Sequence, residues 1–221
     1  MRFPDRTHAG LELADALREA GIAPDVILGL PRGGVPVAFE VSASLGIPMD
    51  VIVVRKLGAP LQPELAMGAL GEGGVRVENP EVLQAVGLSE PALELVVERE
   101  RVKLERRAAL YRGGRPRFEL DGRRVVIVDD GIATGSTAQA AARVARAQGA
   151  SHVFVAVPVA SSSGLAGLAA LTDDVVCVAV PEPFYAVGEW YTDFSQTSDS
   201  DVRALLARAD ARKPPGAPGE Q

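Results

Sequence analysis

The stretch Val125-Val126-Ile127-Val128-Asp129-Asp130-Gly131-Ile132-Ala133-Thr134-Gly135-Ser136-Thr137 decides the fold. Four β-branched apolar residues in a row are typical of a strand buried on both faces, as in the middle of a parallel sheet. Two carboxylates follow at once, and a short loop of glycine and hydroxyl residues leads into an Ala-rich helical pattern that ends near Gly149. The order of strand, acids, loop and helix predicts an α/β fold with a ligand site where the strand ends.

The residue types in this loop predict the chemistry of the ligand. Unpaired amides at a helix N-terminus, two glycines and three hydroxyls suit a phosphate group. Asp129 and Asp130 only accept hydrogen bonds, so they repel phosphate and suit sugar hydroxyls. Ribose 5-phosphate offers both groups at the required separation. The nucleotide triphosphate and dinucleotide loops are excluded because their lysine and their glycine spacing are missing. The alternative is an ordinary capped strand-to-helix turn.

This stretch resembles the signature of the type I phosphoribosyltransferases, which bind phosphoribosyl pyrophosphate (PRPP). The resemblance implies a three-layer α/β fold, with a mainly parallel central sheet, flanking helices and a small hood region. It implies that Asp129 and Asp130, named here the acid pair, are catalytic residues that hold the ribose hydroxyls. It also implies a phosphate loop that binds the 5′-phosphate through Gly131, Ile132, Ala133, Thr134, Gly135, Ser136 and Thr137.

A second strand, loop and helix pattern runs through residues 25–45, and its loop reads Pro31-Arg32-Gly33-Gly34. Two glycines at a helix start expose amides to an anion, and Arg32 adds forked donors. By resemblance this loop grips pyrophosphate and often contains a non-proline cis peptide. Lys56, at the end of a predicted strand over residues 49–55, is a further pyrophosphate contact, and Lys56 and Arg32 are candidate catalytic residues. A plain turn with a solvated Arg and Lys is the alternative.

Residues 181–194 show no periodicity and hold five aromatic residues. Aromatic rings on an irregular segment can stack on a planar base. By resemblance a hood over about residues 181–197, with a contribution from the N-terminus, covers the nucleobase. This predicts base contacts from Phe184, Tyr185 and Trp190 and a metal contact from Asp193, although Mg²⁺ is held mainly by PRPP. The alternative is that these rings only pack the hood.

Composition limits the class of protein. The 221 residues suit a single domain over residues 1–210, followed by a Pro/Gly-rich, disordered tail over residues 211–221. The net charge of −6 argues against nucleic acid as the main partner. No apolar stretch is long enough to span a membrane, and no signal-peptide pattern is present. The single cysteine, Cys177, is predicted to be a buried thiol, and the expected location is the cytoplasm.

The remaining pattern predicts several more elements. A long helix over residues 90–112 is expected to begin after a capping Ser89 and to present a solvated face of mixed charge, and residues 57–63 are expected to be a mobile loop. A final helix is expected to begin at Ser198 with a capping box. Other helices are predicted over residues 5–20, 35–45, 79–86, 137–148 and 163–171, and other strands over residues 25–30, 75–78, 152–159 and 175–180.

The resemblance implies a Mg²⁺-dependent transfer of phosphoribose from PRPP to a purine or pyrimidine base, with release of pyrophosphate. It further implies a homodimer with a role in nucleotide salvage. Ala133 stands where oxopurine-type relatives carry an acid that accepts a proton, so Glu182 and Glu189 remain the candidates for a general base. The alternative function is a regulatory module that binds PRPP or a nucleotide without turnover.

Overall fold

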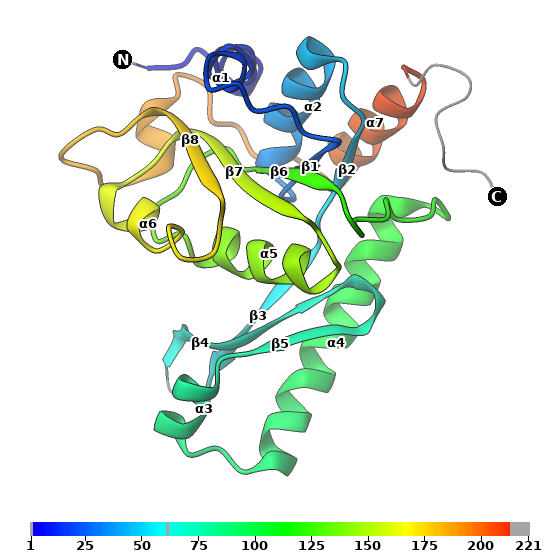
Figure 1. Cartoon of the computed structure of the whole chain (residues 1–221), viewed down its shortest axis with the longest axis vertical. Coiled ribbons are helices and arrows are strands. Elements are labelled where there is room, and N and C mark those ends of the chain that lie inside the picture. Colours follow the sequence, from blue (N-terminus) through cyan, green and yellow to red (C-terminus); the bar gives the residue numbers. More distant parts are fainter. Residues whose placement is uncertain (1, 61, 213–221) are drawn as a thin grey trace.

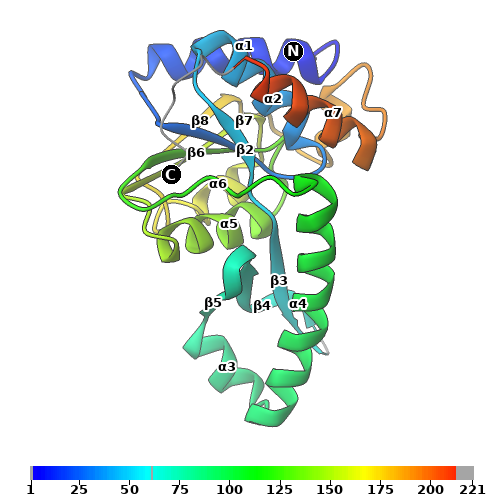
Figure 2. The same ribbon diagram turned by 90° about the vertical axis from the view of Figure 1, so that its right-hand side faces the viewer.

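The computed structural model describes residues 2–60 and 62–212. A five-stranded parallel sheet with helices on both faces forms one part of the molecule, and a three-stranded antiparallel sheet projects from it beside a long helix (Figures 1 and 2). The predicted three-layer α/β class with a mainly parallel central sheet is confirmed. No helix within these residues is both long and apolar enough to cross a lipid bilayer.

The central stretch forms the middle strand of the parallel sheet, as its apolar run predicts. Every side chain from Val125 to Val128 is fully buried. Val126 and Val128 face one side of the sheet, whereas Val125 and Ile127 face the other, because successive side chains of a strand alternate. The strand order is β2 (Met49–Val51), β1 (Val26–Gly29), β6 (Arg124–Val128), β7 (His152–Val159) and β8 (Asp174–Ala179).

Helices cover both faces of this sheet (Figure 2). One face packs against α1 (Arg6–Glu19), α2 (Gly34–Leu45) and α7 (Asp199–Asp210). The other face packs against α5 (Ser136–Ala147), whose alanines allow a close approach, and α6 (Ser162–Ala166) follows β7. Ser198 caps α7 in a capping box with Asp201, which confirms that prediction.

The antiparallel sheet consists of β3 (Val54–Ala59), β4 (Gln62–Gly71) and β5 (Val75–Glu78), with a short turn η1 (Glu72–Gly74) before β5. It is followed by α3 (Pro80–Val86) and then α4 (Glu90–Arg112), which lies along β3 and β4. The 23-residue α4 has the predicted bounds. Ser89 precedes it, but its side chain makes no capping hydrogen bond, so that part of the prediction is wrong.

Two predictions in this region are wrong. The strand expected over residues 49–55 is divided between the two sheets, with Ile52 and Val53 at the junction. Both junction residues are buried, so the apolar run continues through them and does not show where the chain changes sheets. The mobile loop expected over residues 57–63 is instead the β3–β4 hairpin, although residue 61 lies outside the described part. Gly58 lies at an irregularity in the β3–β4 register, which is a common place for glycine in a strand.

Three smaller differences concern the C-terminal half. The helix predicted over residues 163–171 ends at Ala166, because Gly167 follows and the chain continues in turns whose hydrogen bonds join residues three positions apart. Cys177 is half-buried, not fully buried. The hood region contains η2 (Val187–Trp190), and the backbone of Phe3 pairs with it through an N–H bond of 2.8 Å to the Trp190 carbonyl. The disordered tail is predicted over residues 211–221. Of these, residues 213–221 lie outside the described part of the chain.

Candidate functional site

The acid pair lies directly after β6 and against residues 31–34. A Cβ atom placed on Gly33 would lie 2.0 Å from Oδ2 of Asp130, and one on Gly34 would lie 2.8 Å from Cα of Asp129. Both distances are too short for any side chain. The two glycines are therefore required by close packing of the 31–34 loop against the acids. Within that loop the Pro31–Arg32 peptide bond is cis, as the resemblance implies.

Burial and charge give the two acids unusual titration behaviour. Burial raises the pKa of Asp129 well above its usual range, and the neighbouring Asp130 raises it further. Burial also raises the pKa of Asp130, but the Arg6 guanidinium opposes this effect. Arg6 donates a hydrogen bond from Nε to Oδ2 of Asp130 at 2.9 Å, and its Nη2 forms an ion pair with the same oxygen at 2.8 Å. The acid pair is thus a partly desolvated anionic centre with one built-in counter-charge.

Sequence reasoning missed Arg6 because it lies 124 positions from Asp130. A faint signal was present, since a cation in the first turn of a helix opposes the helix dipole. The first turn of α1 contains no acid to compensate it.

The phosphate loop bridges β6 and α5. Its Ile132 is buried and anchored to the neighbouring strand, because its N–H donates to the Val159 carbonyl at 2.9 Å. Gly135 precedes α5 with a φ of 74°, a conformation that favours glycine. The hydroxyls of Thr134 and Ser136 are 2.7 Å apart. The loop therefore presents hydroxyls and free helix amides beside the acid pair, an arrangement suited to a phosphate.

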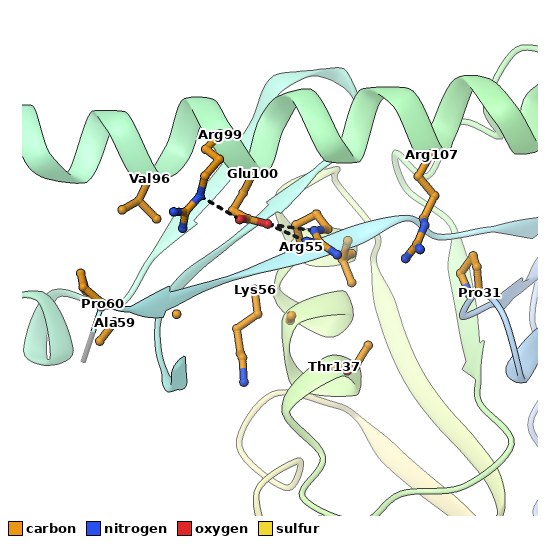
Figure 3. Close-up of a pocket in the computed structure, with 13 residues that line it drawn as sticks. Pro31, Arg55, Lys56, Ala59, Pro60, Val96, Arg99, Glu100, Arg107 and Thr137 are labelled. Carbon is orange, nitrogen blue, oxygen red and sulfur yellow. Dashed lines mark hydrogen bonds and ion pairs between the residues drawn. The ribbon is translucent and has the colours of Figure 1, made fainter. Parts of the chain in front are cut away.

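A cavity of about 490 Å³ joins three of the predicted site residues, Pro31, Lys56 and Thr137. Figure 3 shows Lys56 pointing away from α4, and Arg107 extending from α4 toward Pro31. Further cations at its wall are Arg55 and Arg99. A second cavity of about 350 Å³ is lined by Thr134, Ser136, Gln139 and Arg143, among others. The acid pair lines neither cavity. Pro31, from the loop packed against the acids, lines the first cavity, and Thr134, from the phosphate loop, lines the second.

The charged face of α4 is not simply solvated, which corrects the sequence prediction. Glu100 is only 7% exposed and accepts hydrogen bonds from Arg55 at 2.7 Å and Lys103 at 2.8 Å, with Arg99 at 3.3 Å (Figure 3). One buried carboxylate therefore gathers three cations from β3 and α4. The pattern of mixed charge concealed this cluster because its partner Arg55 lies on another element.

Arg32 extends away from the cavity toward α7. Its Nη1 lies 3.9 Å from Oδ1 of Asp199, which also accepts a hydrogen bond from the Tyr111 hydroxyl at 2.8 Å. The predicted grouping of Arg32 with Lys56 is thus not seen in the side chains, although the backbone of the 31–34 loop adjoins both the acid pair and the cavity.

The three predicted base-binding rings do not share one surface. Tyr185 is 77% exposed, whereas Phe184 and Trp190 are half-buried against Phe3 and Tyr191. None of the three lines either cavity. Asp193 accepts hydrogen bonds from the backbone N–H and the hydroxyl of Ser195, which lower its pKa.

Comparison with known proteins gives the family. The family described as "Phosphoribosyl transferase domain" matches residues 8–181. The chain belongs to the phosphoribosyl transferase domain family. The match covers the acid pair, the phosphate loop and residues 31–34 together, so the resemblance first suggested by one stretch extends over most of the fold.

Individual relatives agree with this assignment. The chain is 54% identical over 207 residues to a protein of Mycobacterium tuberculosis whose name places it provisionally among the phosphoribosyl transferases. That alignment covers 94% of this chain but 47% of the relative, so the chain spans about half the length of the curated relatives it matches. Among solved structures, the protein TT1426 from Thermus thermophilus is 48% identical, with a TM-score of 0.88 over 94% of this chain and 99% of that one.

A more distant likeness concerns the fold alone. A hypothetical protein from Neisseria gonorrhoeae, solved with bound ppGpp, is 15% identical with a TM-score of 0.50. It covers 94% of this chain and 98% of its own length. This likeness shows that a similar α/β fold occurs at low sequence identity.

Proposed function

We propose that this chain binds PRPP and transfers its phosphoribosyl group to a nitrogenous base, releasing pyrophosphate. One observation carries the proposal: an acid pair and a phosphate loop follow the same buried strand, with a tightly packed glycine loop against the acids. This order of groups matches a sugar diol on one side and a phosphate on the other. The family match supports the same activity.

Each group has a proposed part in the reaction. Asp129 and Asp130 accept hydrogen bonds from the ribose hydroxyls and fix the sugar, and their negative charge stabilises positive charge that develops on the ring. The amides and hydroxyls of residues 131–137 hold the 5′-phosphate. The backbone of residues 31–34 and the Lys56 ammonium stabilise the charge of the departing pyrophosphate. Arg107 and the Glu100-bound Arg55 extend that positive wall.

The proposed cofactor is Mg²⁺, which neutralises pyrophosphate charge when it is bound. Among the described residues, no group of three or more His, Cys, Asp or Glu side chains is arranged to hold a metal ion. Mg²⁺ commonly uses one or two carboxylates together with substrate phosphates and water, so the donor set suits a cation that arrives with PRPP. Asp193 would supply at most one carboxylate, part of which is already hydrogen-bonded to Ser195.

We propose that the hood receives the acceptor base, with Phe184, Tyr185 and Trp190 as candidate contacts. The exposed ring of Tyr185 is the one available for stacking without rearrangement. Glu182 and Glu189 remain the candidates for proton acceptor. The carboxylate of Glu182 accepts a hydrogen bond from the Ser162 hydroxyl at 2.8 Å, so its position is fixed at the edge of the hood.

The test is pyrophosphate release from PRPP and Mg²⁺ in the presence of a panel of purine and pyrimidine bases. Turnover with at least one base supports the proposal. PRPP binding without turnover for any base would favour the regulatory alternative. Absence of PRPP binding would refute the proposed transfer and leave only a module that binds a nucleotide. The identity of the base, the role in nucleotide salvage, the homodimer, the single-domain division and the cytoplasmic location stay predictions.

A further inference from the structure

Arg6 joins three parts of the molecule that are far apart in the sequence. Its guanidinium contacts Oδ2 of Asp130 through a hydrogen bond from Nε and an ion pair with Nη2, and its Nη1 donates to the Ser195 carbonyl at 2.8 Å. It also lies over the ring of Phe194, 4.1 Å from the centroid. Its side chain is only 12% exposed, and that of Asp130 is 15% exposed. A hydrogen-bonded ion pair with so little exposure has a well-defined geometry.

This contact determines which carboxylate oxygens face a ligand. Oδ1 of Asp129 accepts a hydrogen bond from the N–H of Asp130 at 2.9 Å, and Oδ2 of Asp130 is held by the Nε and Nη2 atoms of Arg6. The side chains of Asp129 and Asp130 also form a hydrogen bond with each other. A ribose diol that binds both ionised carboxylates replaces this contact with hydrogen bonds from its two hydroxyls.

The hood is tied to the same acid. The Tyr191 hydroxyl donates to the backbone carbonyl of Asp130, and the Tyr191 ring packs 5.0 Å from that of Phe194. Arg6 therefore contacts the acid pair with one edge of its guanidinium and the hood with its other edge and its face. A ligand that moves Asp130 must also change the contacts of Phe194 and Ser195.

We propose that Arg6 is a positioning residue of the sugar site, which holds Asp130 through one oxygen, presents the other oxygen to the ribose diol and couples the acid pair to the hood. This inference rests on the proposed binding of PRPP. It assigns to Arg6 a role that neither the phosphate loop nor the 31–34 loop can supply, because the described residues of those loops place no cation on Asp130.

The charge environment gives the proposal a pH signature. The groups facing the Asp130 carboxylate are Asp129, which follows β6, Arg6 from α1 and the side-chain-free Gly33, while Tyr191 contacts its backbone. Burial raises the pKa of Asp130, and Arg6 opposes the rise more than any other group, with a smaller opposing effect from the hydrogen bond with Asp129. Because the diol binds the ionised carboxylate, removal of Arg6 shifts the onset of sugar binding to higher pH.

The first experiment measures the affinity of PRPP and of ribose 5-phosphate by calorimetry from pH 6 to 9. The proteins are the wild type, Arg6→Gln, Arg6→Lys and the control Arg18→Gln, which removes an exposed cation from the same helix. For Arg6→Gln we expect a loss of about tenfold or more at pH 7 that narrows as the pH rises. Arg6→Lys keeps the positive charge, so the pH profile of its PRPP affinity should resemble that of the wild type. The control should match the wild type.

The second experiment uses Trp190, the single tryptophan of the chain, as a reporter of the hood. We expect acrylamide to quench its fluorescence more strongly in ligand-free Arg6→Gln and in Arg6→Lys, because a lysine cannot bridge Asp130, Ser195 and Phe194 at once. This reading requires no ligand. If Arg6→Gln does not fold, Arg6→Lys alone is used as the test. We then expect stronger quenching than in the wild type and a nearly normal dependence of PRPP affinity on pH.

The outcomes separate the two proposals. If the wild type binds neither PRPP nor ribose 5-phosphate, the proposed function fails and this inference with it. If the wild type binds and Arg6→Gln binds equally well at every pH, only the inference is overturned. An affinity loss that is the same at all pH values, with unchanged Trp190 quenching, would likewise overturn it, since a merely structural role predicts that result.

Discussion

A single methyl group on Gly33 should disable the sugar site while leaving the protein folded. The backbone of Gly33 has a φ of −62°, which any residue adopts, so Gly33→Ala introduces no backbone strain. Its new Cβ would lie 2.0 Å from Oδ2 of Asp130, the oxygen held by Arg6, and 2.6 Å from the carboxyl carbon. The carboxylate or the loop must therefore move by about 1 Å to reach a tolerable contact.

The expected magnitude follows from that displacement. A shift of about 1 Å in a positioning group costs roughly 100-fold in kcat/KM, equivalent to about 2.7 kcal/mol of transition-state stabilisation. Overpacking costs about 1–3 kcal/mol of folding free energy, and the lower flexibility of alanine in the unfolded chain offsets about 0.4–1 kcal/mol of it. For a chain of this size the net cost lowers Tm by at most about 10 °C.

The assay is PRPP affinity and pyrophosphate release, with Tm from calorimetry as the check on folding. Gly167→Ala is the matched control. Its φ of −67° is also unstrained, and its Cβ would clash only with the terminal amide of Gln139, a flexible group that can move aside. If Gly33→Ala binds PRPP as tightly as the wild type does, the close packing of the 31–34 loop against the acid pair has no functional importance.

Three further predictions concern the framework around the site. Hydrogen bonds from Lys103 and Arg55 outweigh the burial that would raise the pKa of Glu100, so its pKa is lowered and its stabilising contribution is lost as pH falls through that value. Tm measured against pH should therefore fall less steeply below about pH 4 in Glu100→Gln than in the wild type, and equal slopes would contradict this. Arg112 joins Asp50 and Glu72 in a network that is about one-tenth exposed, so Arg112→Met should lower the unfolding free energy by about 3 kcal/mol in urea titrations; a loss under about 1 kcal/mol would count against the network. Burial raises the pKa of the Cys177 thiol to about 11, so labelling by iodoacetamide at pH 8 should be slow in the folded protein and fast in urea, and equal rates would show that the thiol is accessible and ionised.

The central strand and its flanking loop could be predicted from the sequence because each relies on local signals. Four β-branched residues require burial on both faces, and Gly135 is required by a positive φ. The division of residues 49–59 between two sheets could not be predicted. Ile52 and Val53 form the junction, and they are as apolar as the strand residues on either side of it. Patterns of this kind report burial but not the identity of the neighbouring element.

The charged contacts were harder to predict for a related reason. Glu100 is one of many mixed charges on α4 until Arg55 is brought against it from β3. Arg6 gains its importance only when α1 and the end of β6 meet. Ion pairs between distant elements leave almost no local pattern, so the cation that faces the acid pair was found from the structure alone.

The acid pair is the basis of the proposed function, and calorimetric titration of PRPP with Mg²⁺ into the double variant Asp129→Asn/Asp130→Asn tests it most directly. Asparagine preserves the side-chain volume but removes the negative charge, so we predict an affinity loss of about 100-fold or more with native secondary structure retained. If the folded double variant binds PRPP as tightly as the wild type does, the acids do not hold the sugar and the proposed site is wrong.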